Sequence, residues 1–425
     1  MYLSTIGGPK SVTGNGGPGR RRWAATSGNV LALGTVSLVT DVSAEMVAAV
    51  LPLYFVIGLQ LSPAAYGLID GIYTGATVLL RLVGGYIADR VQRLKAVAGW
   101  GYGLSATAKL GLLAAGSSVT AIGLAITVDR AGKGLRTAPR DALITLSTPP
   151  AELGRAFGVH RTMDSMGAFA GPLVALAVLA VAGQSFAPVF VTSFCIAAMG
   201  LVILMLFVHD QPREPRPHAQ AVEPRALGKL LRTPGVRRLV PAACLLGLAT
   251  IGDGFVYLLL QRREQLATGW FPLLAVGTSL VYLLLAAPLG ALADRIGRLP
   301  VMLGGYAALA VVYLLLFGPL SGRLLIVLVL GLYGVFYAAT DGVLMALAGP
   351  LLPEGLRTTG IALIQSGQAL AYLGSSVLFG LAWEAWGPTV ASRLAAIAVV
   401  VAMAATAVLL AATRTAPDNH TEKAA

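Results

Sequence analysis

The stretch GYIADRVQRL at residues 85–94 returns later in the chain as GALADRIGRL at residues 290–299. Each copy follows a long apolar run and precedes another one. A small residue, an Asp-Arg pair and a further Arg at fixed spacing predict a tight charged turn between two membrane helices. The repetition indicates a duplicated membrane bundle, an architecture that many secondary transporters share.

The composition also indicates a membrane protein. The 425 residues are 56% hydrophobic and only 12% charged, with a mean hydropathy of +0.77. Soluble domains carry about 25% charged residues, so this chain has too few charges to coat a soluble surface. It must face lipid over most of its outside. Its two cysteines, Cys195 and Cys244, lie in apolar runs and predict no disulfide framework.

The apolar runs define the predicted helices and domains. A transmembrane helix needs about 20 mainly apolar residues. Runs of that kind lie near 30–57, 66–88, 96–116, 119–138, 156–182, 186–208, 239–261, 270–292, 299–319, 323–348, 358–383 and 390–412. The sequence therefore predicts an all-α membrane protein with twelve transmembrane helices in two six-helix pseudo-repeats. The predicted domains are a disordered cytoplasmic N-terminal tail (1–29), a six-helix bundle (30–209), a cytoplasmic linker (210–238), a second six-helix bundle (239–412) and a cytoplasmic C-terminal tail (413–425).

The basic residues predict the orientation. With the N-terminus inside, most of the 31 Lys and Arg residues fall in the inner tails and loops. The outer loops hold only Arg262, Arg263, Arg323 and Arg393. This asymmetry follows the positive-inside rule and predicts that both termini are cytoplasmic in a protein of the cell membrane. It also explains the net charge of +12 without any nucleic-acid partner.

A second repeat shows that the two halves run in parallel. Asp, Pro, Glu, Arg and Gly recur in the same order in residues 141–158 and 341–360, with a two-residue slip. Both stretches connect the fourth and fifth predicted spans of their half. The halves are therefore expected to have the same topology, related by an axis along the membrane normal.

These features together resemble the major facilitator superfamily over nearly the whole chain. The loops after the second and eighth spans resemble a charged motif of that family, at Gly85, Asp89, Arg90 and Arg93, and again at Gly290, Asp294, Arg295 and Arg298. The resemblance implies the major facilitator fold, a small-molecule substrate and movement by alternating access.

Two further stretches carry the resemblance. Residues 130–134 in the fourth span are similar to the family's arginine stretch, with Lys133 where many members have Gln. Residues 167–172 in the fifth span resemble the antiporter motif of proton-coupled drug and metabolite exporters, at Gly167, Gly171 and Pro172. The chain departs from that motif at residues 175–176, where Ala and Leu replace two usual glycines. These glycines and the proline predict either a hinge or seal between the halves, or ordinary helix packing.

Ionisable residues at bilayer depth mark the expected site, because each is costly there and usually faces the interior. The predicted spans hold more acids than bases: Asp41, Glu45, Asp70, Asp129, Asp164, Asp253 and Asp341 against Arg81, Lys109 and Arg130. A buried carboxyl group without a partner is able to exchange protons, which favours proton coupling and a cationic substrate.

We predict that a proton-coupling and substrate cavity includes Asp41, Glu45, Lys109, Arg130, Asp164 and Asp253. Asp41 and Glu45 are four residues apart and share one helix face. The alternative is that partners on other helices hold these groups as structural contacts. Asp70 is expected to be structural.

The charged repeats are interpreted as a latch that holds the inner ends together in the outward-open state. Its predicted members are Gly85, Asp89, Arg90, Arg93, Asp294, Arg295 and Arg298, with Asp141 and Asp341 as partners for the arginines. The alternative is an anchor that fixes topology through positive charge.

The leading function is proton-coupled efflux of a small organic solute by a secondary transporter, with the lipid bilayer and protons as its other partners. An importer of a metabolite or metal is the alternative, and a receptor without transport is a third class. His160, Met163 and Met166 would suit Cu(I) but equally suit packing, so no metal site or cofactor is predicted. The sequence shows no nucleophile-base spacing or phosphate loop, which argues against an enzyme. A monomer is sufficient for a bundle of this kind.

Overall fold

The computed structural model describes residues 27–91, 93–149, 152–210, 232–341, 343–348, 352 and 357–411, and all regular structure among them is helical. The first half contains α1 (Gly28–Ala48), α2 (Leu51–Leu53), η1 (Tyr54–Gly58), α3 (Pro63–Val91), α4 (Leu94–Ala114), α5 (Val119–Leu146), α6 (Leu153–Val181) and α7 (Ala187–Phe207). The second half contains α9 (Pro234–Leu248), α10 (Asp253–Glu264), η3 (Thr268–Trp270), α11 (Pro272–Ile296), α12 (Arg298–Leu315), α13 (Arg323–Thr340), α14 (Val343–Ala348) and α15 (Arg357–Ala411). The predicted all-α class is confirmed.

Local sequence signals set several helix starts. The Ser27 side chain accepts a hydrogen bond from the amide of Val30, and Ser118 accepts one from Ala121. These hydroxyls satisfy amides that a helix start leaves free. Proline begins α3, α9 and α11, where its missing amide costs nothing.

The helices are long and apolar enough to cross a membrane in eight segments of the described chain. These are Gly28–Gly58, Leu153–Val181, Ala187–Phe207, Gly235–Glu264, Thr268–Ile296, Arg298–Leu315, Arg323–Ala348 and Gly360–Leu410. The last segment is divided at Gly387, whose φ of 81° only glycine adopts readily, so α15 consists of two helices joined at a bend. Helices α3, α4 and α5, which correspond to predicted spans, fall outside these eight, and charged residues fill the second half of α5.

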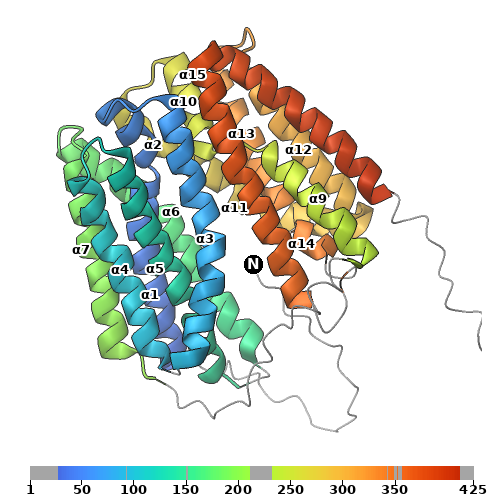
Figure 1. Ribbon diagram of the computed structural model, residues 1–425. Helices are drawn as coiled ribbons and strands as arrows, with labels where there is room; N and C mark the ends of the chain where they lie inside the picture. Colours follow the sequence, from blue (N-terminus) through green and yellow to red (C-terminus); the bar gives the residue numbers. More distant parts are fainter. Residues whose placement is uncertain are drawn as a thin grey trace, which may run out of the picture.

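The two halves lie side by side, the first in blue to green and the second in yellow to red (Figure 1). Within the first half, α1 packs against α6 and α7, and α5 packs against α3 and α4. Between the halves, α3 packs against α15 and α6 packs against α11. The sequence repeat relates these two pairs. Helix α3 is the second predicted span and packs against the eleventh, which is the first part of α15. Helix α6 is the fifth predicted span and packs against the eighth, which is α11.

We call the side on which α1 begins the inner side and the side on which η1 ends the outer side. The largest cluster of buried apolar side chains contains residues of both halves. The cluster around Val30, Leu94 and Leu143, at the inner side, contains only first-half residues among those described. Figure 1 shows the halves meeting at the outer side and diverging toward the inner side. Apolar contact therefore joins the halves mainly at the outer side.

Glycines and aromatic rings make the outer contact. A Cβ at Gly380 of α15 would lie 3.2 Å from the Cα of Gly67 in α3, so the two backbones touch. The Phe255 ring lies 4.7 Å from the Tyr66 ring and 4.8 Å from the Phe379 ring, with both pairs edge to face. The edge-to-face pair of Tyr66 and Phe255 adds apolar contact between the two halves.

The charged repeats are more helical than the sequence predicts. Gly85 to Arg90 lie within α3, whose side chains from Arg81 onward are outside the described part of the structure. In the second copy, Asp294 and Arg295 belong to the last turn of α11, and the chain turns at Gly297 with φ 101°. The prediction that the Asp-Arg pair forms the turn is wrong, because both pairs remain inside the preceding helix.

Candidate functional site

Two adjoining cavities lie between the halves, with volumes of 440 Å³ and 240 Å³. Helices α1, α6, α10, α11 and α13 line the larger cavity, and helices α1, α3, α5, α10 and α15 line the smaller one. Both cavities are lined by Glu45, Ala48, Pro52, Asp253 and Gly254. The shared wall therefore carries one acid from each half, Glu45 and Asp253.

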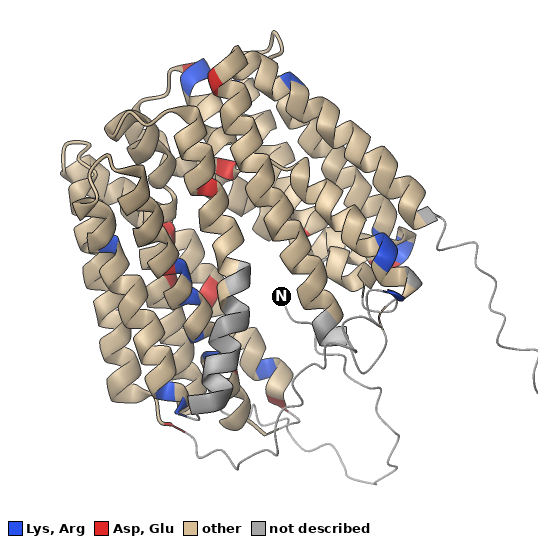
Figure 2. Cartoon of the chain, in the orientation of Figure 1, with Lys and Arg blue, Asp and Glu red and all other residues tan. Residues whose placement is uncertain are grey.

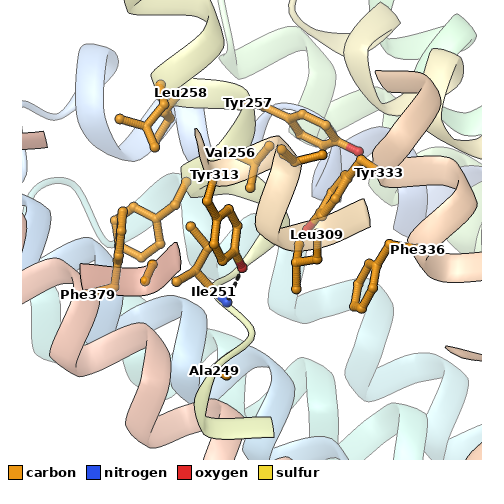
Figure 3. Close-up of a cluster of buried hydrophobic side chains, with 14 of the residues drawn as sticks. Ala249, Ile251, Val256, Tyr257, Leu258, Leu309, Tyr313, Tyr333, Phe336 and Phe379 are labelled. Carbon is orange, nitrogen blue, oxygen red and sulfur yellow. Dashed lines mark hydrogen bonds between the residues drawn. The ribbon is translucent and has the colours of Figure 1, made fainter. Parts of the chain in front are cut away.

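Asp253 reaches this wall because the seventh predicted span is broken. Helix α9 ends at Leu248 and α10 begins at Asp253, and Figure 3 shows the amide of Ile251, in the intervening segment, bonded to the Tyr313 hydroxyl at 2.9 Å. A carboxylate in the first turn of a helix is favoured by the helix dipole. Asp253 also accepts hydrogen bonds from the hydroxyls of Tyr333, at 2.7 Å, and Tyr337.

Asp70 of α3 connects the first half to this break. Its carboxylate accepts a hydrogen bond from the Ser376 hydroxyl of α15 at 2.6 Å. It also lies against Gly252, where a Cβ would be 2.8 Å from the Asp70 Cγ. Only glycine fits at that position without moving Asp70. Asp70 lines the smaller cavity, so the sequence-based expectation of a purely structural residue missed its place in the site.

Asp129 is the centre of a charge cluster inside the first half. It accepts a hydrogen bond from Ser105 at 2.5 Å and pairs with Arg130, and the Lys109 Nζ lies 3.6 Å away. The Arg130 guanidinium lies over the Tyr73 ring, 3.8 Å from its centroid, and lines the smaller cavity. Lys109 is 3% exposed and lines neither cavity. The structure places Lys109 against Asp129 of α5, behind the two cavities, and its predicted part in proton coupling stays a prediction.

Asp41 and Asp164 form a second cluster between α1, α5 and α6. The Asp41 carboxylate lies 3.7 Å from Arg136, and Asp164 accepts a hydrogen bond from Ser37 at 2.6 Å. Asp164 also lies 3.9 Å from Arg140. Neither acid lines the two cavities, so the structure separates them from Glu45. Figure 2 shows that the helices of the first half carry both acidic (red) and basic (blue) residues along their length.

Glu45 and Lys133 differ from the other charged lining residues. Neither makes a hydrogen bond or an ion pair within 4.0 Å to a residue that the structure describes. The acids whose charge acts on Lys133 are Asp41 first and then Glu45. These two groups are therefore the ones most available to a substrate or a proton. The sequence marked Lys133 only as a departure from a family motif.

Comparison with known proteins agrees with this arrangement of two helical halves around a central cavity. The family profile of the Major Facilitator Superfamily matches residues 33–277 and 264–425. The chain belongs to the major facilitator superfamily. An uncharacterized MFS-type transporter of Methanocaldococcus jannaschii is 30% identical over 365 residues, 84% of this chain and 89% of that protein. An uncharacterized protein of Mycobacterium tuberculosis is 34% identical over 204 residues, 47% of each chain.

Solved structures agree on the fold of this major facilitator chain. The nucleoside transporter NupG superposes with a TM-score of 0.76 at 14% identity, over 90% of this chain and 98% of its own. The peptide transporter POT in complex with sulfate superposes with a TM-score of 0.74 at 17% identity, over 93% and 96%. Family membership makes this protein an integral membrane secondary transporter of a small molecule and not an enzyme.

The acids Asp141 and Asp341 were expected to pair with arginines of the charged repeats, but they have other partners in this structure. Asp141 accepts a hydrogen bond from its neighbour Arg140 at 3.1 Å, and Asp341 accepts one from Tyr282 at 2.7 Å. Arg298 lies 3.9 Å from Asp294 and donates to the carbonyl of Ala346. The predicted partnership of the two acids with latch arginines is therefore absent among the described side chains. The side chains of Asp89 and Arg90, and the surroundings of Gly85, lie outside the described part of the structure. The side chains of Arg93 and Arg295 are exposed.

The antiporter-like motif packs within one half. A Cβ at Gly171 would lie 2.7 Å from the Glu45 Cβ and 2.8 Å from the Met46 amide nitrogen. A Cβ at Gly167 would lie even closer to the carbonyl oxygen of Leu38. These glycines bring α6 against α1 rather than sealing the halves against each other. Pro172 lines the larger cavity beside Glu45.

The possible soft-metal face is not assembled as a site. His160 is buried, whereas Met166 is 57% exposed. The Met163 sulfur points at Gly34 of α1 as a packing contact. In the described part of the chain, no three His, Cys, Asp or Glu residues are grouped to hold a metal ion.

Proposed function

We propose that this transporter moves a small organic solute out of the cell by alternating access, coupled to the entry of protons. The observation that carries the proposal is Glu45, a carboxyl group without an ion-pair partner among the described residues, on the wall shared by two central cavities. A carboxyl group of this kind holds either a proton or a substrate group, and competition for one site couples two movements in opposite directions. Asp253 is the second acid on that shared wall, and Arg130 lines only the smaller of the two cavities.

The proposed topology has twelve membrane crossings with both termini in the cytoplasm. It adds α3, α4 and α5 to the eight apolar segments and counts the two parts of α15 separately. The placement of most Lys and Arg residues on the inner side supports this orientation. The proposed domains keep the predicted bounds, although most of the linker and both tails lie outside the described residues.

The outer contact supports a resting conformation that is closed outside. The outer contact consists of the close approach of Gly67 and Gly380, the packed aromatic rings, and the contacts of Asp70 with Ser376 of α15 and with Gly252 before α10. We call these last two contacts the Asp70 bridge. Alternating access then requires these contacts to break when the inner ends close. We propose the charged repeats, with Arg93 and Arg295 exposed here, as contacts of that second conformation.

Proton flux in proteoliposomes tests the function directly. A pH-sensitive dye is trapped inside, a pH gradient is imposed, and candidate solutes are added one at a time. An exporter of the proposed kind moves protons opposite to the solute, whereas symport of both in one direction would identify the importer. Solute flux with no accompanying proton flux would contradict the coupling. Liposomes without protein and the Glu45→Gln variant are the controls.

A further inference from the structure

We propose that the 440 Å³ cavity is a binding site for the cationic group of an organic amine or quaternary ammonium compound. This inference rests on the proposed function and names its substrate class. A cavity of this volume lies in the range, about 300–1,000 Å³, that accommodates small organic ligands.

The charges of this cavity all have one sign. Its described lining residues include Glu45, Asp253 and Asp341, and they include no lysine or arginine. Three carboxylates in one partly desolvated space repel one another, and a bound cation relieves that repulsion. Arg130 and Lys133 act on Glu45 from the smaller cavity, so the negative charge that a bound cation would neutralise in the larger cavity is mainly that of Asp253 and Asp341.

The carboxylates are arranged to accept further contacts. Tyr282 donates to Oδ2 of Asp341, and the Oδ1 atom of that carboxylate has no hydrogen bond to a described residue. Glu45 has neither a hydrogen bond nor an ion pair in the same set of residues. The first half and the second half thus each present an acceptor to the cavity, so one bound cation would contact both halves.

Hydroxyl groups also line this cavity. The Thr278 side chain is 4% exposed and lies within hydrogen-bonding reach of the Tyr257 hydroxyl. These hydroxyls give the cavity neutral polar groups besides its carboxylates.

Aromatic rings complete the recognition of an organic cation. Tyr257, Phe271 and Tyr337 line the same cavity as the acids. Ring faces attract cations and pack against the apolar part of the same molecule. Lys133 and Arg130 line only the smaller cavity, so a substrate is expected to place its cationic end in the larger one.

Calorimetric titration of the purified, detergent-solubilised full chain tests this site. The probes are tetraphenylphosphonium and tetraphenylborate, which have nearly the same shape and opposite charge. We expect the cation to bind at least roughly tenfold more tightly than the anion, a difference set by the sign of the charge alone. Glu45→Gln and Asp341→Asn should each weaken tetraphenylphosphonium binding by roughly tenfold, and Glu152→Gln, which removes a carboxylate outside both cavities, should leave it unchanged.

Equal binding of the two probes would overturn the inference, as would unchanged cation binding in Asp341→Asn. If Glu45→Gln is not recovered as folded protein, Asp341→Asn carries the same test. Equilibrium binding in detergent requires neither a membrane nor a proton gradient. A proton-coupled exporter of neutral solutes would therefore fail this titration and still pass the flux experiment, which keeps the two proposals distinguishable.

Discussion

The interior carboxylates of this chain divide into those that have hydrogen-bond or ion-pair partners and those that have none among the described residues. Asp129 has three partners, and Asp41 and Asp164 have arginines nearby. Glu45 lies one helical turn from Asp41 on the same helix, but it faces the cavities instead. A difference of four positions on one helix thus separates a residue held inside the first half from a residue open to exchange.

Glu45→Gln is expected to abolish proton-coupled transport, because the amide keeps the shape of the side chain and cannot exchange a proton. The rate of proton-coupled flux in proteoliposomes should fall by at least about tenfold, the loss expected for a group that transfers a proton. The measurement is dye-reported proton flux at equal amounts of inserted protein. Glu45→Asp, which retains the carboxyl group, is the matched control, and wild-type flux in Glu45→Gln would exclude Glu45 as the coupling residue.

Asp129→Asn is expected to destabilise the protein. The change leaves the buried Lys109 and Arg130 without their common counter-charge, and removing one partner of a buried ion pair costs about 3–5 kcal/mol. The thermal midpoint of the detergent-solubilised protein should fall well below that of the wild type. Asp294→Asn is the control, since it removes an exposed carboxylate; equal midpoints for the two variants would contradict the structural role of Asp129.

At the scale of helices, the sequence patterns were sufficient to predict some features of the fold and insufficient for others. The apolar runs predicted the order of the helices, and the repeats predicted the matched halves. The break between α9 and α10 was missed, because the run near 239–261 stays apolar through Ile251 and only Gly252 and Gly254 mark it. Helix faces were also uncertain, which is why Lys109 was assigned to the cavity. The contact between Asp70 and Ser376 joins residues 306 positions apart, and no local pattern encodes it.

Gly252→Ala is expected to loosen the outer contact. The added Cβ collides with the Asp70 carboxylate, which then leaves its position against the start of α10. Spin labels at Ile57→Cys and Trp386→Cys, in a background with Cys195 and Cys244 replaced by serine, report the separation of the outer ends. We expect the distance distribution to shift toward longer distances.

The matched control for this variant is Gly331→Ala. That glycine lies inside α13, and a Cβ there meets nothing within 4 Å. Its distance distribution should equal that of the parent protein. The same unchanged distribution in Gly252→Ala would show that the Asp70 bridge does not hold the outer ends together.

The whole molecule presents two different ends to its surroundings. Buried apolar contact and the contacts of Asp70 join the halves at the outer side, whereas each of the two smaller apolar clusters contains residues of one half only among those described. The central cavities lie on the inner side of the outer contact. Ser279, which lines the larger cavity, is exposed. Access to the site is therefore expected from the inner side alone in this conformation.

Labelling from each side of the membrane tests this expectation. In the same cysteine-free background, Ser279→Cys should react with a membrane-impermeant maleimide applied to the inner side and resist the reagent applied to the outer side. Trp386→Cys, on the bend of α15, should show the opposite preference. Reaction of Ser279→Cys from the outer side alone would mean that the protein in the membrane prefers the other conformation.

The missing side chain at Gly252 also bears on the interchange of halves between related transporters. Position 252 belongs to the second half, but the group that forbids a Cβ there is Asp70 of the first half. A hybrid that joins this first half to a second half from a relative will assemble well only if the donor brings glycine to that position. Compatibility between exchanged halves thus depends in part on a position that has no side chain of its own.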